Sequence, residues 1–125
     1  MKIGHVGLTC SSEEKADRFY GSLFGLEKQE PKTVPADTAN AIFGIDVDLN
    51  VINYTGDGVR FEVFLSESNI TKRPIDHICI EVENLEAFVD QCRKKGVKVN
   101  RVPRGESRVT FIEDFDGNLF EVKGG

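Results

Sequence analysis

The stretch "DGVRFEV", Asp57–Val63, returns near the end of the chain as "DGNLFEV", Asp116–Val122. Each copy is an Asp-Gly pair followed by an alternating run, and each run carries one glutamate, Glu62 or Glu121, among apolar residues. This pattern predicts a strand at both places. A strand repeated in this way indicates a chain built from two similar halves.

The elements around the two copies follow the same order. The first half contains "IGHVGLTC" (3–10) and "SSEEKADRFYGSLFGLEKQE" (11–30), and the second contains "IDHICIEV" (75–82) and "ENLEAFVDQCRKKGVKVNRV" (83–102). In each half a short alternating strand leads into a polar helix start, and further strands follow. We therefore expect an α+β fold made of two tandem βαβββ modules.

Both predicted helices have end signals and an apolar face. Ser11 or Ser12 should cap the first helix, Glu83 and Asn84 should form the start of the second, and Gly25 and Gly96 should end them. Apolar residues recur at helical spacing at Ala16, Phe19, Tyr20 and Leu23 in the first helix and at Leu85, Phe88, Val89 and Cys92 in the second.

The segment "SESNITKRP", Ser66–Pro74, is polar and rich in turn-forming residues, so we interpret it as a linker. It joins module 1, about 1–66, to module 2, about 74–125, within a single domain of residues 1–125. A module of roughly 60 residues would be only marginally stable alone, which favours two modules packed side by side. In module 1 we also expect a short helix or turn at Asp37–Phe43.

The composition excludes several kinds of partner. The chain has 125 residues, of which 39% are hydrophobic and 30% charged, and its net charge of -5 without a basic stripe argues against nucleic acid. No apolar run approaches the roughly 20 residues that a bilayer span needs, and the chain does not open with a leader pattern. We expect a soluble, cytoplasmic protein with no membrane partner.

The three cysteines, Cys10, Cys79 and Cys92, are odd in number and have no CxxC spacing. This favours free thiols in a reducing cytosol, and we interpret them as buried small hydrophobic residues. Cys79 follows His77 by two residues on the same strand face, so it is also a candidate for lining a pocket.

Strand alternation separates the apolar residues from two histidines and two glutamates. Successive residues of a strand face opposite sides of the sheet. The apolar residues of the first and last strand of each module share one parity, which gives the face that a helix should cover. His5, Glu62, His77 and Glu121 have the other parity and should lie on the open, concave face.

Two imidazoles and two carboxylates suit a divalent transition metal, with nickel, cobalt, zinc or iron as candidates. A single histidine on a strand is more often a structural hydrogen-bonding group, and a glutamate on an open face is more often simply solvated. The chain has only two histidines, however, and both they and the two glutamates occupy equivalent places. This equivalence favours a metal site over a duplication that merely copied the residues.

Over nearly its full length the chain resembles the vicinal oxygen chelate superfamily, and within it the glyoxalase I-like members. The segments that carry the resemblance are "HVGLTCSSEEKADRFYGSLFGLE" (5–27), "DHICIEVENLEAFVDQCRKKGV" (76–97) and "EDFDGNLFEVK" (113–123). The last segment usually has a proline before its Asp-Gly pair, where this chain has Phe115. The superfamily includes glyoxalase I, methylmalonyl-CoA epimerase, fosfomycin and bleomycin resistance proteins, and extradiol dioxygenases.

The resemblance implies paired βαβββ modules that form a cupped mixed sheet around a metal site. It names His5, Glu62, His77 and Glu121 as the metal ligands, the same four residues that strand parity selects. It also implies a small-molecule substrate and a homodimer. Whether one chain or two chains complete the site stays open at this point.

The implied activity is that of a metal-dependent glyoxalase-like lyase or isomerase, which acts on a small vicinal-oxygen carbonyl substrate through an enediolate. Glu121 or Glu62 would be the catalytic proton shuttle. Glyoxalase I commonly has an arginine shortly after the first histidine to hold glutathione, and "HVGLTCS" has none. The alternatives are an epimerase, an antibiotic-type binding or resistance protein, and an iron-dependent dioxygenase.

Four cations are further candidates for contacting a substrate carboxylate or phosphate, although a solvated surface position is the more common role. Arg60 shares the parity of Glu62, and the other three are Arg108, Lys72 and Arg73.

Overall fold

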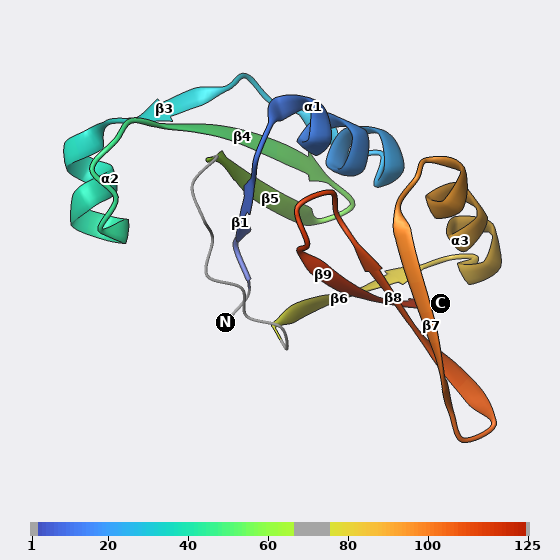
Figure 1. Cartoon of the computed structure of the whole chain (residues 1–125). Coiled ribbons are helices and arrows are strands. Elements are labelled where there is room, and N and C mark those ends of the chain that lie inside the picture. Colours follow the sequence, from blue (N-terminus) through green and yellow to red (C-terminus); the bar gives the residue numbers. More distant parts are fainter. Residues whose placement is uncertain (1–2, 67–75, 125) are drawn as a thin grey trace. The chain divides into compact units, whose positions relative to one another are not determined.

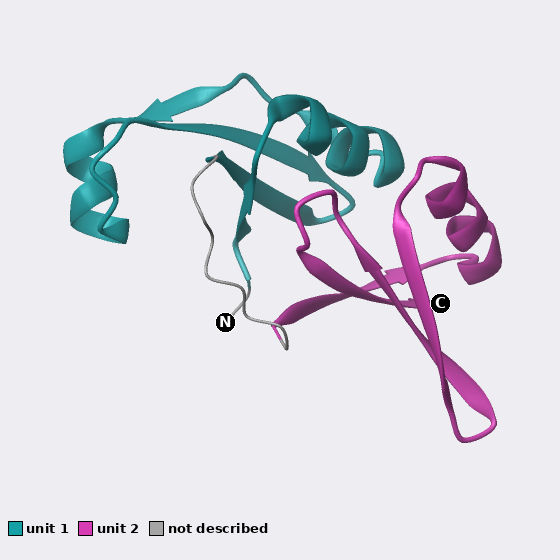
Figure 2. Ribbon diagram, in the orientation of Figure 1, with its two compact units in different colours: residues 1–70 teal, residues 71–125 magenta. Residues whose placement is uncertain are grey.

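The computed structural model describes residues 3–66 and 76–124. The chain divides into two compact units, Met1–Ile70 and Thr71–Gly125 (Figure 2). The predicted linker, Ser66–Pro74, lies outside the described residues except for its first residue. No helix in the described part of the chain has the length and apolar character to cross a membrane.

Unit 1 is a helix-covered mixed sheet with strand order β1-β5-β4-β2, in which β1 runs parallel to β5 (Figure 1). Both β2 and β3 pair antiparallel with β4, so two short strands together fill one strand position of the βαβββ order. The elements are β1 (Val6–Cys10), α1 (Glu13–Ala16), η1 (Asp17–Leu23), β2 (Glu27–Lys28), β3 (Lys32–Val34), α2 (Ala36–Phe43), β4 (Leu49–Gly56) and β5 (Val59–Leu65).

Unit 2 repeats this plan without the extra helix. Its sheet has the order β6-β9-β8-β7, with β6 parallel to β9 and the other pairs antiparallel. The predicted α+β class and βαβββ order are therefore confirmed. The elements are β6 (His77–Val82), α3 (Leu85–Lys94), β7 (Lys98–Arg104), β8 (Ser107–Glu113) and β9 (Leu119–Gly124).

The first helix has the predicted cap but not a uniform geometry. The Ser12 side chain accepts a hydrogen bond from the backbone N–H of Lys15, as an N-cap residue should. After one α-helical turn the chain widens into the π-helix η1, where the N–H of Phe24 donates to the carbonyl of Phe19. The apolar spacing alone predicted an α-helix throughout. Over so few turns, this spacing does not distinguish an α-helix from the wider π-helix.

The helix of unit 1 is fixed to its sheet by aromatic rings. Tyr20 lies 5.3 Å from Phe61 and 5.7 Å from Tyr54 between ring centroids, and all three side chains are buried. The Tyr54 hydroxyl donates to a carboxylate oxygen of Asp17 at 2.7 Å. Burial first, and this carboxylate second, raise the pKa of Tyr54 well above its usual value.

In unit 2 an ion pair joins the helix to the sheet. Arg101 of β7 donates to both carboxylate oxygens of Glu86 on α3 at 2.8 and 2.9 Å, and also to the Thr110 hydroxyl. The bonds to Arg101 lower the pKa of Glu86. The predicted cap is present, since Asn84 accepts from the N–H of Ala87.

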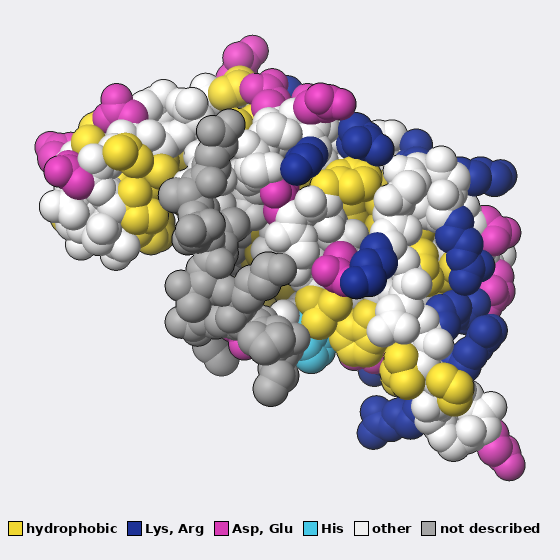
Figure 3. Space-filling model, in the orientation of Figure 1, with side chains coloured by type: hydrophobic (Ala, Val, Ile, Leu, Met, Phe, Trp, Pro, Cys, Tyr) yellow, Lys and Arg dark blue, Asp and Glu magenta, His cyan; other side chains and the backbone are white. Residues whose placement is uncertain are grey.

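Helix α2 has no counterpart in unit 2 and leaves apolar side chains exposed. Figure 3 shows hydrophobic side chains gathered over this part of unit 1. Phe43 packs its ring edge-on against Phe64 of β5, with the centroids 5.3 Å apart. The other exposed apolar residues of α2 and the segment after it are Ile42, Ile45 and Val47.

The cysteine prediction is correct for two residues and wrong for the third. None of the three cysteines forms a disulfide, and Cys10 and Cys92 are buried, but Cys79 is exposed. The strand parity explains the error, because Cys79 faces the same side as His77, which the helix does not cover. Burial raises the pKa of Cys92 to about 11.

Two phenylalanines of unit 1 test the assignment of the core. Phe61 is 2% exposed and Phe43 is 49% exposed. We expect Phe61→Ala to reduce the free energy of unfolding by about 3–5 kcal/mol, because it leaves a cavity under the helix. Phe43→Ala should reduce it by about 1 kcal/mol or less. Urea unfolding followed by circular dichroism measures both, and equal losses would contradict the assigned core.

Cysteine labelling tests the two faces of the sheets. Iodoacetamide at pH 8 should modify the folded protein at Cys79 alone, because Cys10 and Cys92 are buried and the pKa of Cys92 is raised to about 11. Peptide mass spectrometry locates the label, and Cys79→Ser should abolish it. Labelling of Cys92 at a similar rate in the folded protein would contradict the packing of α3.

Candidate functional site

In unit 1 the pairing of the first and last strands brings His5 to Glu62. The parallel ladder sets Val6 beside Phe61 and Gly7 beside Glu62, and His5 is the residue just before β1. The side chains of His5 and Glu62 extend to the same side, so that His5 Nδ1 lies 3.4 Å from Glu62 Oε2. Phe61 and Val63, which flank Glu62 along β5, are buried on the other side of the sheet.

Unit 2 forms the corresponding pair in the corresponding place. Its parallel ladder sets His77 beside Leu119 and Cys79 beside Glu121. His77 Nε2 lies 3.9 Å from Glu121 Oε1. Along β6 exposed and half-buried residues alternate, as expected for a strand with one uncovered face.

Within each pair, the spacing of the two donor atoms can be compared with that of two ligands on one metal ion. Two ligand atoms that each lie about 2.1 Å from one ion are roughly 3.0–3.4 Å apart at angles of about 90–110°. The His5–Glu62 separation of 3.4 Å falls at the upper end of this range, and the His77–Glu121 separation of 3.9 Å needs a small side-chain rotation. Each pair therefore suits two adjacent positions around a transition metal.

Each unit supplies one imidazole and one carboxylate. Among residues 3–66 and 76–124, no three or more His, Cys, Asp and Glu side chains are grouped closely enough to hold one ion. The structure thus brings the four predicted ligands together as two pairs, and the complete four-ligand site stays a prediction.

Polar side chains surround Glu62. Arg60 has the same parity on β5, and its Nη2 lies 3.7 Å from Glu62 Oε2. Arg60 Nε donates to Asn53 Oδ1 at 3.1 Å, and Asn53, the register partner of Glu62 on β4, is only 5% exposed. Glu62 Oε2 therefore lies near both the His5 imidazole, at 3.4 Å, and the anchored Arg60 guanidinium, at 3.7 Å.

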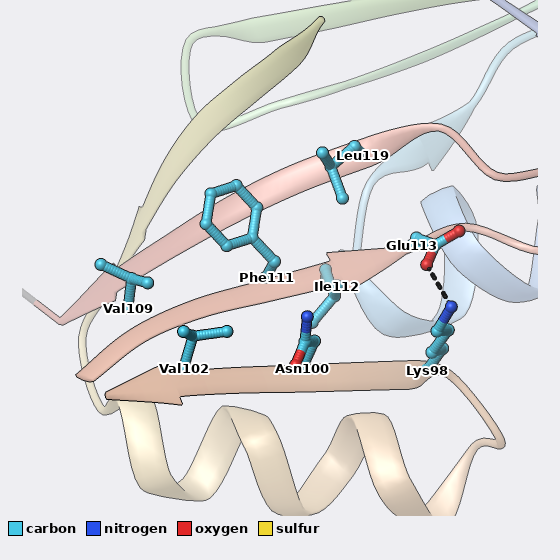
Figure 4. Close-up of a pocket in the computed structure, with 8 residues that line it drawn as sticks. All are labelled: Lys98, Asn100, Val102, Val109, Phe111, Ile112, Glu113 and Leu119. Atoms are coloured by element: carbon cyan, nitrogen blue, oxygen red, sulfur yellow. Dashed lines mark ion pairs between the residues drawn. The ribbon is translucent and has the colours of Figure 1, made fainter. Parts of the chain in front are cut away.

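Glu121 has apolar neighbours on the strand ladder and one lysine, Lys123, whose Nζ lies 4.0 Å from Glu121 Oε2. Its register partner on β8 is Phe111, whose ring contacts His77 at 5.6 Å between centroids. Residues paired across a ladder share a face, so Phe111 and Leu119 lie on the side of Glu121. They line a hollow of about 380 Å³ over β7, β8 and β9 (Figure 4). The remaining lining residues are Lys98, Asn100, Val102, Val109, Ile112 and Glu113.

The other candidates from the sequence have mixed outcomes. Arg60 lies on the predicted side beside Glu62, but Arg108 has the parity of the buried Thr110 and acts electrostatically on Glu86 at α3. Lys72 and Arg73 lie outside the described residues. Cys79 is exposed beside Glu121 on the open face.

Sequence reasoning missed Asn53 and Phe111, the residues that line up beside the two glutamates. A strand sequence predicts which face a residue occupies, but the register of the neighbouring strand decides which residue sits next to it. A signal was present in the repeat, since Asn53 and Phe111 each belong to the strand that precedes a "DG..FEV" copy.

Among curated proteins, the chain is similar to epimerases that act on coenzyme A esters. It is 24% identical over 100 residues to the mitochondrial methylmalonyl-CoA epimerase of Bos taurus, covering 78% of this chain and 56% of the relative. It therefore spans about half the length of that mammalian relative. It is 26% identical over 133 residues to the ethylmalonyl-CoA/methylmalonyl-CoA epimerase of Cereibacter sphaeroides, covering 98% and 96% of the two chains.

Solved structures show the same fold. A glyoxalase family protein from Enterococcus faecalis superposes with a TM-score of 0.74 at 19% identity, covering 97% of this chain and 95% of that one. The fosfomycin resistance protein FosX from Listeria monocytogenes gives a TM-score of 0.75 at 18% identity, covering 100% and 93%. A variant of that protein, complexed with Mn(II) and 1S,2S-dihydroxypropylphosphonic acid, gives 0.74 at 19% identity, covering 99% and 90%.

The family model provides the assignment. The model of the Glyoxalase/Bleomycin resistance protein/Dioxygenase superfamily matches residues 2–122, which is nearly the whole chain. This range includes both histidines and both glutamates of the two pairs. The chain belongs to the Glyoxalase/Bleomycin resistance protein/Dioxygenase superfamily.

Proposed function

We propose that the protein is a metal-dependent enzyme that moves a proton on a carbon beside the carbonyl group of a small, oxygen-rich substrate. His5, Glu62, His77 and Glu121 hold the metal, one histidine and one glutamate from each unit. The observation that carries the proposal is the His–Glu pair at the equivalent place in both units, with separations of 3.4 and 3.9 Å. Neither pair is explained by the packing of the core, since all four side chains lie on the uncovered faces.

When bound, a divalent ion supplies Lewis acidity, which stabilises negative charge on the carbonyl oxygen as the neighbouring carbon loses its proton. The donor set of two imidazoles and two carboxylates suits nickel, cobalt, zinc or iron, and also manganese. Manganese enters this set because a FosX complex with Mn(II) has the same fold.

Glu121 is our candidate for the base that removes the proton. Its neighbours on the strand ladder, Leu119 and Phe111, line the hollow of unit 2, so a substrate carbon held there would lie beside the carboxylate. Glu62 has the Arg60 guanidinium at 3.7 Å, and Glu121 has Lys123 Nζ at 4.0 Å. In an epimerisation Glu62 would return a proton to the opposite face of the carbon, whereas an isomerisation would return it to the adjacent carbon.

The curated relatives favour epimerisation as the net reaction. The mammalian and bacterial relatives are epimerases, and the bacterial one matches over nearly the full length of both chains. The glyoxalase-type lyase that the sequence first implied would share the same proton removal. It would also need a group for the glutathione carboxylate, and "HVGLTCS" offers no arginine there. We therefore propose a malonyl-type thioester, in preference to a glutathione adduct, as the substrate.

A homodimer is part of the same proposal. Unit 1 exposes apolar side chains on α2 and just after it, including Ile42 at 65% and Val47 at 55%. Apolar surface of this kind is typical of a protein contact.

Metal analysis tests the site. The purified protein, incubated with nickel, cobalt, zinc, manganese or ferrous iron, should bind about one ion per chain. The double variant His5→Ala/Glu121→Ala should bind none at micromolar metal. Each single variant, His5→Ala or His77→Ala, should weaken binding at least roughly tenfold, because each removes one ligand. Elemental analysis and calorimetry provide the measurements.

Glu106→Ala is the matched control for metal binding, because it removes an exposed carboxylate from the β7–β8 hairpin without touching either pair. It should bind metal like the natural protein. If His77→Ala binds metal as tightly as the natural protein, the two pairs do not share an ion and the proposed site is wrong.

Isotope exchange tests the reaction. In deuterium oxide the metal-loaded protein should place deuterium on the carbon between the carboxylate and the thioester of methylmalonyl-CoA, as seen by mass spectrometry. Glu121→Gln should slow this exchange at least about 100-fold, because the amide cannot accept the proton. Conversion of the methylglyoxal–glutathione adduct, with no exchange into the thioester, would instead establish the lyase.

A further inference from the structure

The two copies of the repeat agree at the glutamate and differ beside it. Two residues before the glutamate, "DGVRFEV" has Arg60 and "DGNLFEV" has Leu119. The register partners of the two glutamates differ in the same way, with Asn53 beside Glu62 and Phe111 beside Glu121. Both polar residues thus belong to unit 1 and both apolar residues to unit 2.

The polar pair of unit 1, Arg60 and Asn53, has a geometry suited to binding an anion. Asn53 is 5% exposed, and its Oδ1 accepts from Arg60 Nε at 3.1 Å, which fixes the plane of the guanidinium. The side chain of Arg60 is still 46% exposed, with Glu62 Oε2 3.7 Å from Nη2. A guanidinium carries five N–H groups, and those not directed at Asn53 can bind a carboxylate or phosphonate.

The apolar pair of unit 2 cannot perform this task. Phe111 and Leu119 line the hollow of about 380 Å³, which suits an uncharged part of a ligand. Lys98, the cation in its lining, is paired with Glu113 at 2.9 Å. Both glutamates have a cation nearby, since Lys123 Nζ lies 4.0 Å from Glu121 Oε2, but only Glu62 has a cation whose side chain is hydrogen-bonded to the register partner of the glutamate.

We propose that Arg60, held by Asn53, binds an anionic group of the substrate and so determines which end of the substrate lies at the Glu62 side. The substrate class is then a carbonyl compound with two neighbouring oxygens and a separate carboxylate or phosphonate. This inference rests on the proposed metal-dependent function. Arg60 touches the substrate and Asn53 is a positioning residue.

Two hydroxamates isolate the anionic contact. Acetohydroxamate and malonomonohydroxamate both offer a metal two neighbouring oxygens, but only the second carries a carboxylate. Calorimetry on the nickel-loaded protein measures the affinity for each. We expect malonomonohydroxamate to bind roughly tenfold more tightly or better, as is typical of a charge-assisted hydrogen bond.

Arg60→Gln should abolish this preference while leaving the affinity for acetohydroxamate and the metal content unchanged. Arg60→Lys should retain part of the preference, because it keeps the charge without the planar fork. Arg104→Gln is the matched control, since it removes one exposed guanidinium from β7 at the same net charge, and it should keep the full preference. Phosphonoacetohydroxamate carries a phosphonate where malonomonohydroxamate carries a carboxylate. Comparing the affinities of the two compounds shows which anionic group Arg60 binds more tightly.

Several outcomes would overturn the inference. Equal binding of both hydroxamates by the natural protein, or an unchanged preference in Arg60→Gln, would show that Arg60 is not the receptor. If Arg60→Gln weakens the binding of both hydroxamates equally, Arg60 supports the metal site through Glu62 and does not bind the anionic group. If the protein binds metal but neither hydroxamate, or no metal at all, the proposed function has failed and the inference fails with it.

Discussion

The parallel pairing of the first and last strand of each unit is the constraint on which the other features depend. It joins β1 to β5 and β6 to β9, although the members of each pair are separated by a helix and by the intervening strands. Because the two strands run side by side in the same direction, a histidine at the start of one comes within reach of a glutamate in the other. The helix between them must cross one face, and the opposite face is left for the His–Glu pair.

Strand alternation then lets one short sequence perform two tasks. Phe61 and Val63 are buried under the helix of unit 1, and Glu62 between them faces the other side. Phe120 and Val122 flank Glu121 in the same way in unit 2. A change of register by one residue would bury a carboxylate without a partner, which is strongly unfavourable. The same apolar packing that stabilises each sheet therefore also fixes the position of its glutamate.

The departures from the repeat are concentrated in unit 1 and on its open face. Unit 1 has a strand split into β2 and β3, the added helix α2, and the hydrogen-bonded Arg60 and Asn53 where unit 2 has Leu119 and Phe111. Phe43 of α2 also reaches this face, where it packs against Phe64. The duplicated scaffold keeps a His–Glu pair in both copies, while the residues beside the glutamate differ between the two units.

The sequence by itself determined the α+β class, the βαβββ order and the face of each candidate ligand, because strand and helix periods are local properties of the chain. It also placed both helix starts, with Ser12 and Asn84 among the candidate caps, since a cap bonds to residues three positions away. It did not show the π-helix at Asp17–Leu23, because the spacing of apolar residues does not separate an α-helix from a π-helix over so few turns. The exposure of Cys79 and the places of Asn53 and Phe111 were decided only by tertiary structure, because strand register and helix coverage join residues far apart in the chain.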